Sequence, residues 1–201
     1  LVKVQLADEV KYEIEGVTIL VNNVLETLQT LATYHRQKLG IPIIGITGSY
    51  SKTTTKNTLH QILKTQNEIF ATKESFNNRL GIAKAINEDL KDSDEIAIIE
   101  MGTYGIGEIR EICSWVRPHV SVITGIAPVH LERMNNLENI LDAKSEIVEL
   151  AGSVVINGEV FIEKYTQSRA DVFNHISNQI NDSEVIKIHV PLASDYGNKI
   201  V

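Results

Sequence analysis

Cysteine, basic charge and long apolar runs are scarce in this sequence, and each scarcity excludes a class of protein. Its 201 residues include one cysteine, Cys113, which cannot form an internal disulfide framework, so a reducing cytoplasm is the expected compartment. No apolar run approaches the ~20 residues that a membrane-spanning helix needs. The start, at 1–5, lacks the apolar core of a signal peptide. We therefore expect a cytoplasmic protein without a membrane span.

A basic surface is also missing. The chain has 19 Lys+Arg against 26 Asp+Glu, which gives a net charge of −7 and a pI of about 5.4. The basic residues are scattered among acidic ones, as on solvated helix faces, so nucleic-acid binding is not expected. The hydrophobic share of 43% and the charged share of 22% are those of a globular domain and exclude a mainly disordered chain. The length suffices for one domain with a sizeable core.

Short apolar runs alternate with segments of helical periodicity along most of the chain. The expected strands are 17–21, 41–47, 68–72, 95–100, 119–126, 153–157 and 184–190, and the expected helices are 24–39, 52–65, 78–90, 107–116, 137–150 and 165–180. Five consecutive strand–helix units favour an α/β fold with a mostly parallel, doubly wound sheet and helices on both faces. Residues 191–201 follow no pattern and are interpreted as a linker or frayed end.

One loop has the composition of a phosphate-binding site. The segment Gly45-Ile46-Thr47-Gly48-Ser49-Tyr50-Ser51-Lys52-Thr53-Thr54-Thr55 lies between an expected buried strand and an expected helix, where backbone N–H groups and the helix dipole attract anions. Lys52 is placed to neutralise the β- and γ-phosphates, and Thr53 to offer its hydroxyl to Mg²⁺. The expected nucleotide-binding residues are Gly48, Ser49, Tyr50, Ser51, Lys52, Thr53 and Thr54.

The match to a P-loop has one defect, at Ser51. The usual loop has glycine immediately before the lysine. If the backbone needs a positive φ there, serine costs on the order of 1 kcal/mol. Taken alone, the segment is equally compatible with a turn before a Thr-rich helix.

Further segments supply a context for this loop. They are Phe76-Asn77-Asn78-Arg79-Leu80-Gly81, Glu100-Met101-Gly102, Ile123-Thr124-Gly125-Ile126-Ala127-Pro128-Val129-His130-Leu131-Glu132 and Ala143-Lys144-Ser145-Glu146. With the phosphate loop, their order and spacing resemble the central domain of the Mur ligases over roughly residues 20–160. Within that family the resemblance is greatest to the members that add D-alanyl-D-alanine. It implies a P-loop NTPase-like fold for this part of the chain.

The resemblance also implies an activity and a domain organisation. Family members use ATP and Mg²⁺ to convert a substrate carboxylate into an acyl phosphate, which an amine attacks to form an amide of a peptidoglycan precursor. The implied partners are ATP, a UDP-muramoyl-peptide and a dipeptide or amino acid. The central ATP-binding domain would cover 23–190, after a remnant or linker of a preceding domain at 1–22. Because the chain also starts without Met, we expect a fragment that is not a complete enzyme.

Several site residues follow from the resemblance alone. Glu100 would bind the Mg²⁺ that Thr53 also contacts, and His130 would serve a second metal. Lys144 would be carbamylated by CO₂ and so become a metal ligand, a reaction that requires a neutral amine. Asn77 and Asn78 are expected as a turn and N-cap before the helix at 78–90, and the resemblance implies that one of them, Asn78, also faces the nucleotide or substrate. The expected catalytic residues are Lys52, His130 and Lys144.

Two other interpretations remain open. Ser51, together with Arg79 where the family often carries an acidic residue, is compatible with a non-catalytic nucleotide-binding module. A small-molecule kinase on a P-loop fold is less well supported, because the sequence has no Arg-rich segment that resembles a lid. A relative that acts on folate or polyglutamate substrates is also possible within the ligase interpretation.

Overall fold

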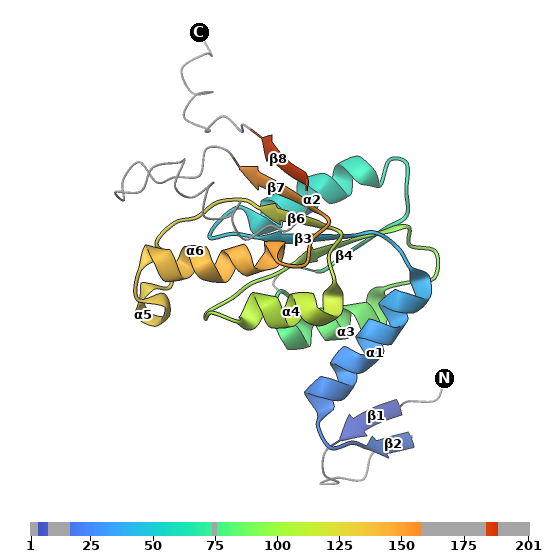
Figure 1. Ribbon diagram of the computed structural model, residues 1–201. Coiled ribbons are helices and arrows are strands. Elements are labelled where there is room, and N and C mark those ends of the chain that lie inside the picture. Colours follow the sequence, from blue (N-terminus) through green and yellow to red (C-terminus); the bar gives the residue numbers. More distant parts are fainter. Residues whose placement is uncertain (1–3, 8–16, 74–75, 158–183, 189–201) are drawn as a thin grey trace.

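The computed structural model describes residues 4–7, 17–73, 76–157 and 184–188, and contains a six-stranded parallel sheet. The strand order is β4-β5-β3-β6-β7-β8 (Figure 1). These strands are β3 (Ile43–Thr47), β4 (Ile69–Ala71), β5 (Ile96–Glu100), β6 (Val120–Ile123), β7 (Ser153–Asn157) and β8 (Glu184–Ile188). Two further strands, β1 (Val4–Ala7) and β2 (Val17–Leu20), form a separate parallel pair.

Helices cover both faces of the large sheet. They are α1 (Val24–Leu39), α2 (Lys52–Leu63), α3 (Arg79–Asp89), α4 (Glu108–Val116), α5 (Leu131–Met134) and α6 (Leu137–Ser145), the last continued by the 3₁₀ turn η1 (Glu146–Val148). Helix α2 lies on one side of the sheet, and α3, α4 and α6 lie on the other (Figure 1). The expected doubly wound, parallel α/β fold is thus confirmed.

The strand order places a topological switch point at the carboxyl end of β3. From β3 the chain passes through α2 to the edge strand β4, whereas from β5 and β6 it passes to helices on the opposite face. Connections that diverge from neighbouring strands leave a gap at the sheet edge, where α/β folds bind ligands. The residues that follow β3, β5 and β6 are therefore the ones placed to form a site.

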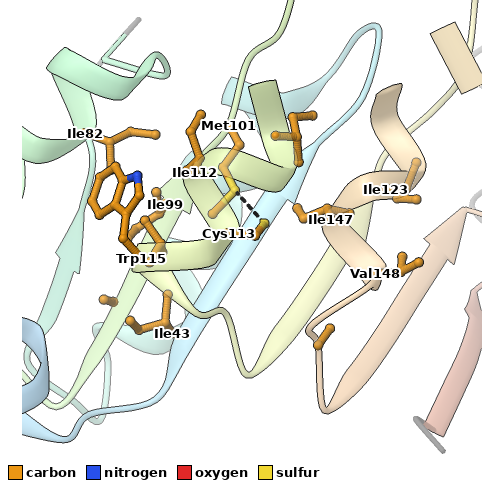
Figure 2. Packing of buried hydrophobic residues seen from close by; sticks show 14 of the residues in the cluster. Ile43, Ile82, Ile99, Met101, Ile112, Cys113, Trp115, Ile123, Ile147 and Val148 are labelled. Atoms are coloured by element: carbon orange, nitrogen blue, oxygen red, sulfur yellow. Dashed lines mark hydrogen bonds between the residues drawn. The ribbon is translucent and has the colours of Figure 1, made fainter. Parts of the chain in front are cut away.

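The core lies between the sheet and the helices on the side of α4. Helix α4 buries Ile109, Ile112, Cys113 and Val116, whose spacing of three and four residues places them on one helix face. Figure 2 shows this face packed beside Met101, with Cys113 Sγ 3.8 Å from Met101 Sδ. Burial raises the pKa of the Cys113 thiol to about 12, so this cysteine acts as a small apolar side chain and not as a nucleophile.

Two expected elements end earlier in the structure by three residues or more. The expected strand 119–126 ends at Ile123, because Thr124 turns towards the phosphate loop and bonds its backbone. The expected helix 137–150 ends at Ser145 and continues as a 3₁₀ turn. Of the expected strand 184–190, β8 covers Glu184–Ile188, and 189–190 lie outside the described residues. The expected helix 165–180 and the stretch 191–201 lie outside the described residues. Among the helices that the structure describes, none has the length and apolar character needed to cross a bilayer.

Candidate functional site

The loop between β3 and α2 packs directly against the segment that follows β6. Gly48 has a φ of +151°, and a Cβ at this position would lie 2.1 Å from Thr124 Oγ1. The Thr124 hydroxyl donates to the Tyr50 carbonyl oxygen at 2.6 Å. Only glycine therefore fits at position 48, and the loop backbone is held from the neighbouring strand end.

Ser49 and Tyr50 fix the same contact from the loop side. The Ser49 amide donates to the Gly125 carbonyl oxygen at 2.8 Å. Its hydroxyl donates to the Ala127 carbonyl oxygen and accepts from the Ala127 amide, both at 3.0 Å. A Cβ on Gly125 would lie 2.3 Å from the Tyr50 ring. These contacts thus hold the loop against the segment that follows β6.

Ser51 adopts the backbone conformation that the glycine of the usual loop would have. Its φ of 59° and ψ of 8° are left-handed, and its side chain makes no capping hydrogen bond to α2. The Thr55 amide donates to the Ser51 carbonyl oxygen at 2.9 Å, which closes the first helical turn. The loop therefore keeps its shape with serine, at the steric cost of a Cβ in this region.

Lys52 is folded back over the loop. Its ammonium donates to the Gly48 carbonyl oxygen at 2.9 Å. Burial lowers the pKa of Lys52, and the charge of Glu100 partly opposes this effect. The lysine therefore lies beside both the loop and the carboxyl end of β5.

Glu100 is a buried carboxylate bonded from two elements. It ends β5 and is 2% exposed. Its Oε2 accepts from the Thr53 hydroxyl at 2.9 Å and lies 3.4 Å from Lys56 Nζ. Its Oε1 accepts from the Asn77 side-chain amide at 3.1 Å. The structure therefore brings the two expected first-metal residues together, with Lys56 and Asn77 as neighbours that sequence reasoning missed.

The two asparagines before α3 have different partners. Asn78 is the N-cap of α3, and its Oδ1 accepts from the Gly81 amide at 2.8 Å. Asn77 is the one whose side chain reaches Glu100. The expected ligand-facing residue Asn78 therefore has a capping contact, although it also lines a cavity of about 290 Å³ with Asn77 and Tyr104.

Lys144 is buried on α6, which lies on the other face of the sheet from α2 (Figure 1). It lies near the end of α6 and is 3% exposed. Burial is the main cause that lowers its pKa to about 8, the charge of Lys52 lowers it further, and Glu108 acts in the opposite direction. An amine with this pKa has a substantial neutral fraction near physiological pH.

His130 lies apart from the Glu100 cluster. It has a φ of 55°, its ring meets the Tyr104 ring edge-on with centroids 4.9 Å apart, and its side chain is 44% exposed. The Arg133 guanidinium lies 5.0 Å from the centroid of the same tyrosine ring. The contacts of His130 are thus with Tyr104 and with Glu132, whose Oε1 is 3.9 Å from Nδ1.

The residues near Glu100 offer oxygen ligands but no complete metal cage. Within the part of the chain that the structure describes, no three His, Cys, Asp or Glu side chains gather closely enough to hold a metal ion. A buried carboxylate beside a threonine hydroxyl suits a hard cation such as Mg²⁺, which keeps several waters and takes further ligands from phosphates. The donor set therefore fits Mg²⁺ bound together with a phosphate ligand.

A family comparison identifies the domain to which this site belongs. The family described as the Mur ligase middle domain matches residues 46–192, which include the phosphate loop, Glu100, His130 and Lys144. The chain belongs to the Mur ligase family. This confirms the resemblance drawn from the motifs.

Individual Mur ligases show the same relationship. The UDP-N-acetylmuramoyl-tripeptide–D-alanyl-D-alanine ligase of Bacillus subtilis is 39% identical over 130 residues, which are 65% of this chain and 28% of that protein. The crystal structure of MurF from Acinetobacter baumannii matches with a TM-score of 0.76 at 25% identity, over 90% of this chain and 38% of that one.

A third relative matches in fold. The MurF ligase from Thermotoga maritima in complex with ADP has a TM-score of 0.75 at 24% identity, over 90% of this chain and 40% of that one. The chain thus spans less than half the length of the Mur ligases that it matches.

Proposed function

We propose that this chain is the nucleotide-binding part of an ATP-dependent carboxylate–amine ligase of peptidoglycan precursor synthesis. The observation that carries the proposal is the loop from Gly48 to Thr53, whose lysine and threonine meet Glu100 at the carboxyl edge of the sheet. The family membership and the ligase names of the relatives support the reaction class. The ADP carried by the Thermotoga maritima ligase supports an adenine nucleotide as the ligand of this fold.

The nucleotide phosphates would lie over the start of α2. The loop amides and the positive end of the helix dipole favour an anion there. Lys52 now donates to the Gly48 carbonyl oxygen, and a β- or γ-phosphate oxygen would replace that acceptor. Tyr50 and Thr54 flank this position in the loop and the first turn of α2.

Thr53 and Glu100 would hold Mg²⁺ beside the phosphates. When bound, the metal neutralises charge on the phosphoryl group that is transferred. The chain's own contribution is to hold the hydroxyl of the exposed Thr53 against the buried carboxylate of Glu100.

Lys144 and His130 are proposed to serve the acyl-transfer side of the reaction. The lowered pKa of Lys144 supports carbamylation by CO₂, because the neutral amine is the form that reacts. The carbamate would be an anionic metal ligand. His130 is proposed as a ligand of the second metal, and its side chain is accessible to a bound ligand at 44% exposure.

The domain organisation and the substrates are part of the same proposal. Residues 23–190 would form the central ATP-binding domain, 1–22 would come from a preceding domain and 191–201 would be a linker. The substrates would be a UDP-muramoyl-tripeptide and D-alanyl-D-alanine, by the names of the relatives, and the protein would act in the cytoplasm.

Calorimetric titration with a non-hydrolysable ATP analogue, with and without Mg²⁺, tests the nucleotide site. We expect Mg²⁺-dependent binding that Lys52→Ala abolishes, because phosphate charge is then left unpaired. Lys64→Ala is the matched control, since Lys64 is an exposed lysine just after α2. Unchanged affinity in Lys52→Ala would overturn the phosphate-loop assignment.

A non-catalytic nucleotide-binding module is the second candidate. Ser51 and Arg79 favour it, because these two residue types depart from the pattern expected of a catalytic member. The release of ADP by the full-length protein in the presence of both proposed substrates separates the two candidates, because this chain would supply only the central domain. Substrate-dependent release supports the ligase, whereas nucleotide binding without release supports the module.

A further inference from the structure

Lys56 is a buried cation directly beside the proposed metal-binding carboxylate. It lies on α2, three residues after Thr53 and four after Lys52, so all three side chains share one helix face. Its side chain and that of Glu100 are each 2% exposed, and Lys56 Nζ is 3.4 Å from Glu100 Oε2. A lysine this buried has little room to move its ammonium away from the carboxylate.

The carboxylate of Glu100 is consequently balanced before any ligand binds. Oε2 faces both the Thr53 hydroxyl and the Lys56 ammonium, while Oε1 accepts from Asn77. Taken together, Glu100 and Lys56 have no net charge. A divalent cation that approaches Oε2 meets an adjacent positive charge, and this repulsion is strong where water is excluded.

A bound nucleotide changes this balance. Its phosphates would bring several negative charges to the start of α2, within reach of Lys52, and would offset the charge of Lys56 as well. The metal would then enter a site with a net negative charge. Binding of the nucleotide and of the metal would thus be coupled, and such coupling acts equally in both directions.

We propose that Lys56 makes the binding of a divalent cation at Glu100 depend on bound nucleotide. The inference rests on the proposed function, because it takes Glu100 and Thr53 as metal ligands. Lys56 is a positioning residue here, which acts through Glu100 and selects the metal–nucleotide complex over the free metal.

A Mn²⁺ titration of the purified protein without nucleotide, followed by the electron paramagnetic resonance of free Mn²⁺, tests the inference. Lys56→Met removes the charge and keeps an unbranched side chain. We expect Lys56→Met to bind Mn²⁺ at least about tenfold more tightly than the wild type, because the Glu100 charge is no longer offset. Lys64→Met changes the net charge equally at an exposed position and should match the wild type.

Two further variants distinguish the inference from a general change in charge or folding. Lys56→Met/Glu100→Gln should lose the gain in Mn²⁺ affinity, and a double variant that keeps the gain would overturn the inference. If circular dichroism shows that Lys56→Met is unfolded, Lys56→Gln replaces it, because its amide can still donate to Oε2. Wild-type Mn²⁺ affinity in the folded neutral variant would also overturn the inference.

The affinity for the ATP analogue with and without Mn²⁺ tests the underlying site separately. In the wild type Mn²⁺ should tighten analogue binding, and Glu100→Gln should remove that effect. In Lys56→Met the tightening should be smaller. If Glu100→Gln left the metal effect intact, the proposed metal site itself would be wrong, whereas an intact Glu100 effect with no change in Lys56→Met would overturn the role of Lys56 alone.

Discussion

Two buried lysines flank the phosphate loop, and their surroundings differ. Lys56, on α2, is 1% exposed and has the Glu100 carboxylate 3.4 Å from its ammonium. Lys144, on α6, is 3% exposed, and the pKa of its amine is lowered to about 8. Similar burial is therefore accompanied by an ion pair at Lys56 and by a lowered amine pKa at Lys144.

The neighbours of the two lysines account for this difference. At Lys56 the neighbour is the Glu100 carboxylate. At Lys144 burial disfavours the charged amine, Lys52 adds a second positive charge, and the opposing effect of Glu108 is the smallest of the three. The α2 side of the loop thus holds an ion pair, and the α6 side holds an amine suited to reaction in its neutral form.

Breaking the ion pair on the α2 side should give the largest effect on stability. Lys56→Met or Glu100→Gln alone leaves one buried charge without its partner, which lowers the free energy of unfolding by about 3–5 kcal/mol. The double variant Lys56→Met/Glu100→Gln should lose much less than the sum of the two. Urea unfolding of all four proteins measures the coupling. Additive losses would show that the two side chains act independently.

Removing the Lys144 amine on α6 should raise the free energy of unfolding instead of lowering it. The pKa of Lys144 falls from 10.5 to about 8 on folding, so the unfolded chain binds more protons between these pH values and stability rises with pH there. The penalty is fully present below pH 8 and amounts to about 3 kcal/mol. Lys144→Met should therefore stabilise the protein by up to that amount at pH 7.

The pH dependence of the stability gained by Lys144→Met serves as the control for this prediction. Urea unfolding at pH 7 and at pH 10 should give a smaller advantage of Lys144→Met at the higher pH, because the wild-type penalty is relieved there. A difference between the two proteins that does not change with pH would mean that Lys144 titrates normally in the folded state.

Local patterns predicted the sheet and the loop well, because both depend on neighbours in the sequence. The helix expected at 24–39 is observed as α1, with Gly40 at a φ of 63° directly after it. Strand β3, which leads into the loop, and strand β5, which ends at Glu100, were recognisable in the sequence as apolar runs. Helical spacing also places Lys56 on the face of Lys52 and Thr53, but spacing alone does not reveal that its ammonium is buried against a carboxylate.

The contacts that escaped prediction join residues far apart in the sequence. Helix α6 was expected to continue to 150, but its end at Ser145 precedes Glu146, whose buried carboxylate accepts from the Arg110 amide at 2.9 Å. The contact of the Asn77 side chain with Glu100 likewise joins residues 23 positions apart. Neither contact could be read from local spacing.

A substitution in the phosphate loop itself should give a smaller change in stability. Ser51 has a φ of 59°, a region that glycine occupies without a Cβ clash. Ser51→Gly should raise the free energy of unfolding by about 1 kcal/mol, the relief of strain less the added entropy of the unfolded chain. The melting temperature should rise by about 2–4 °C. Ser51→Ala keeps the Cβ and is the matched control. Equal stability of the two variants would mean that Ser51 is not strained.

The smallest effect is expected for an ion pair at the surface. Arg79 pairs with Glu111, but their side chains are 45% and 43% exposed, so water and salt screen both charges in a way that they cannot screen Lys56 and Glu100. A double-mutant cycle with Arg79→Ala and Glu111→Ala should give a coupling of less than about 1 kcal/mol that falls further in high salt. A coupling as large as that of the buried pair would contradict the idea that burial sets the strength of these ion pairs. A small coupling would show that the pair of Arg79 and Glu111 contributes little to the stability of the fold.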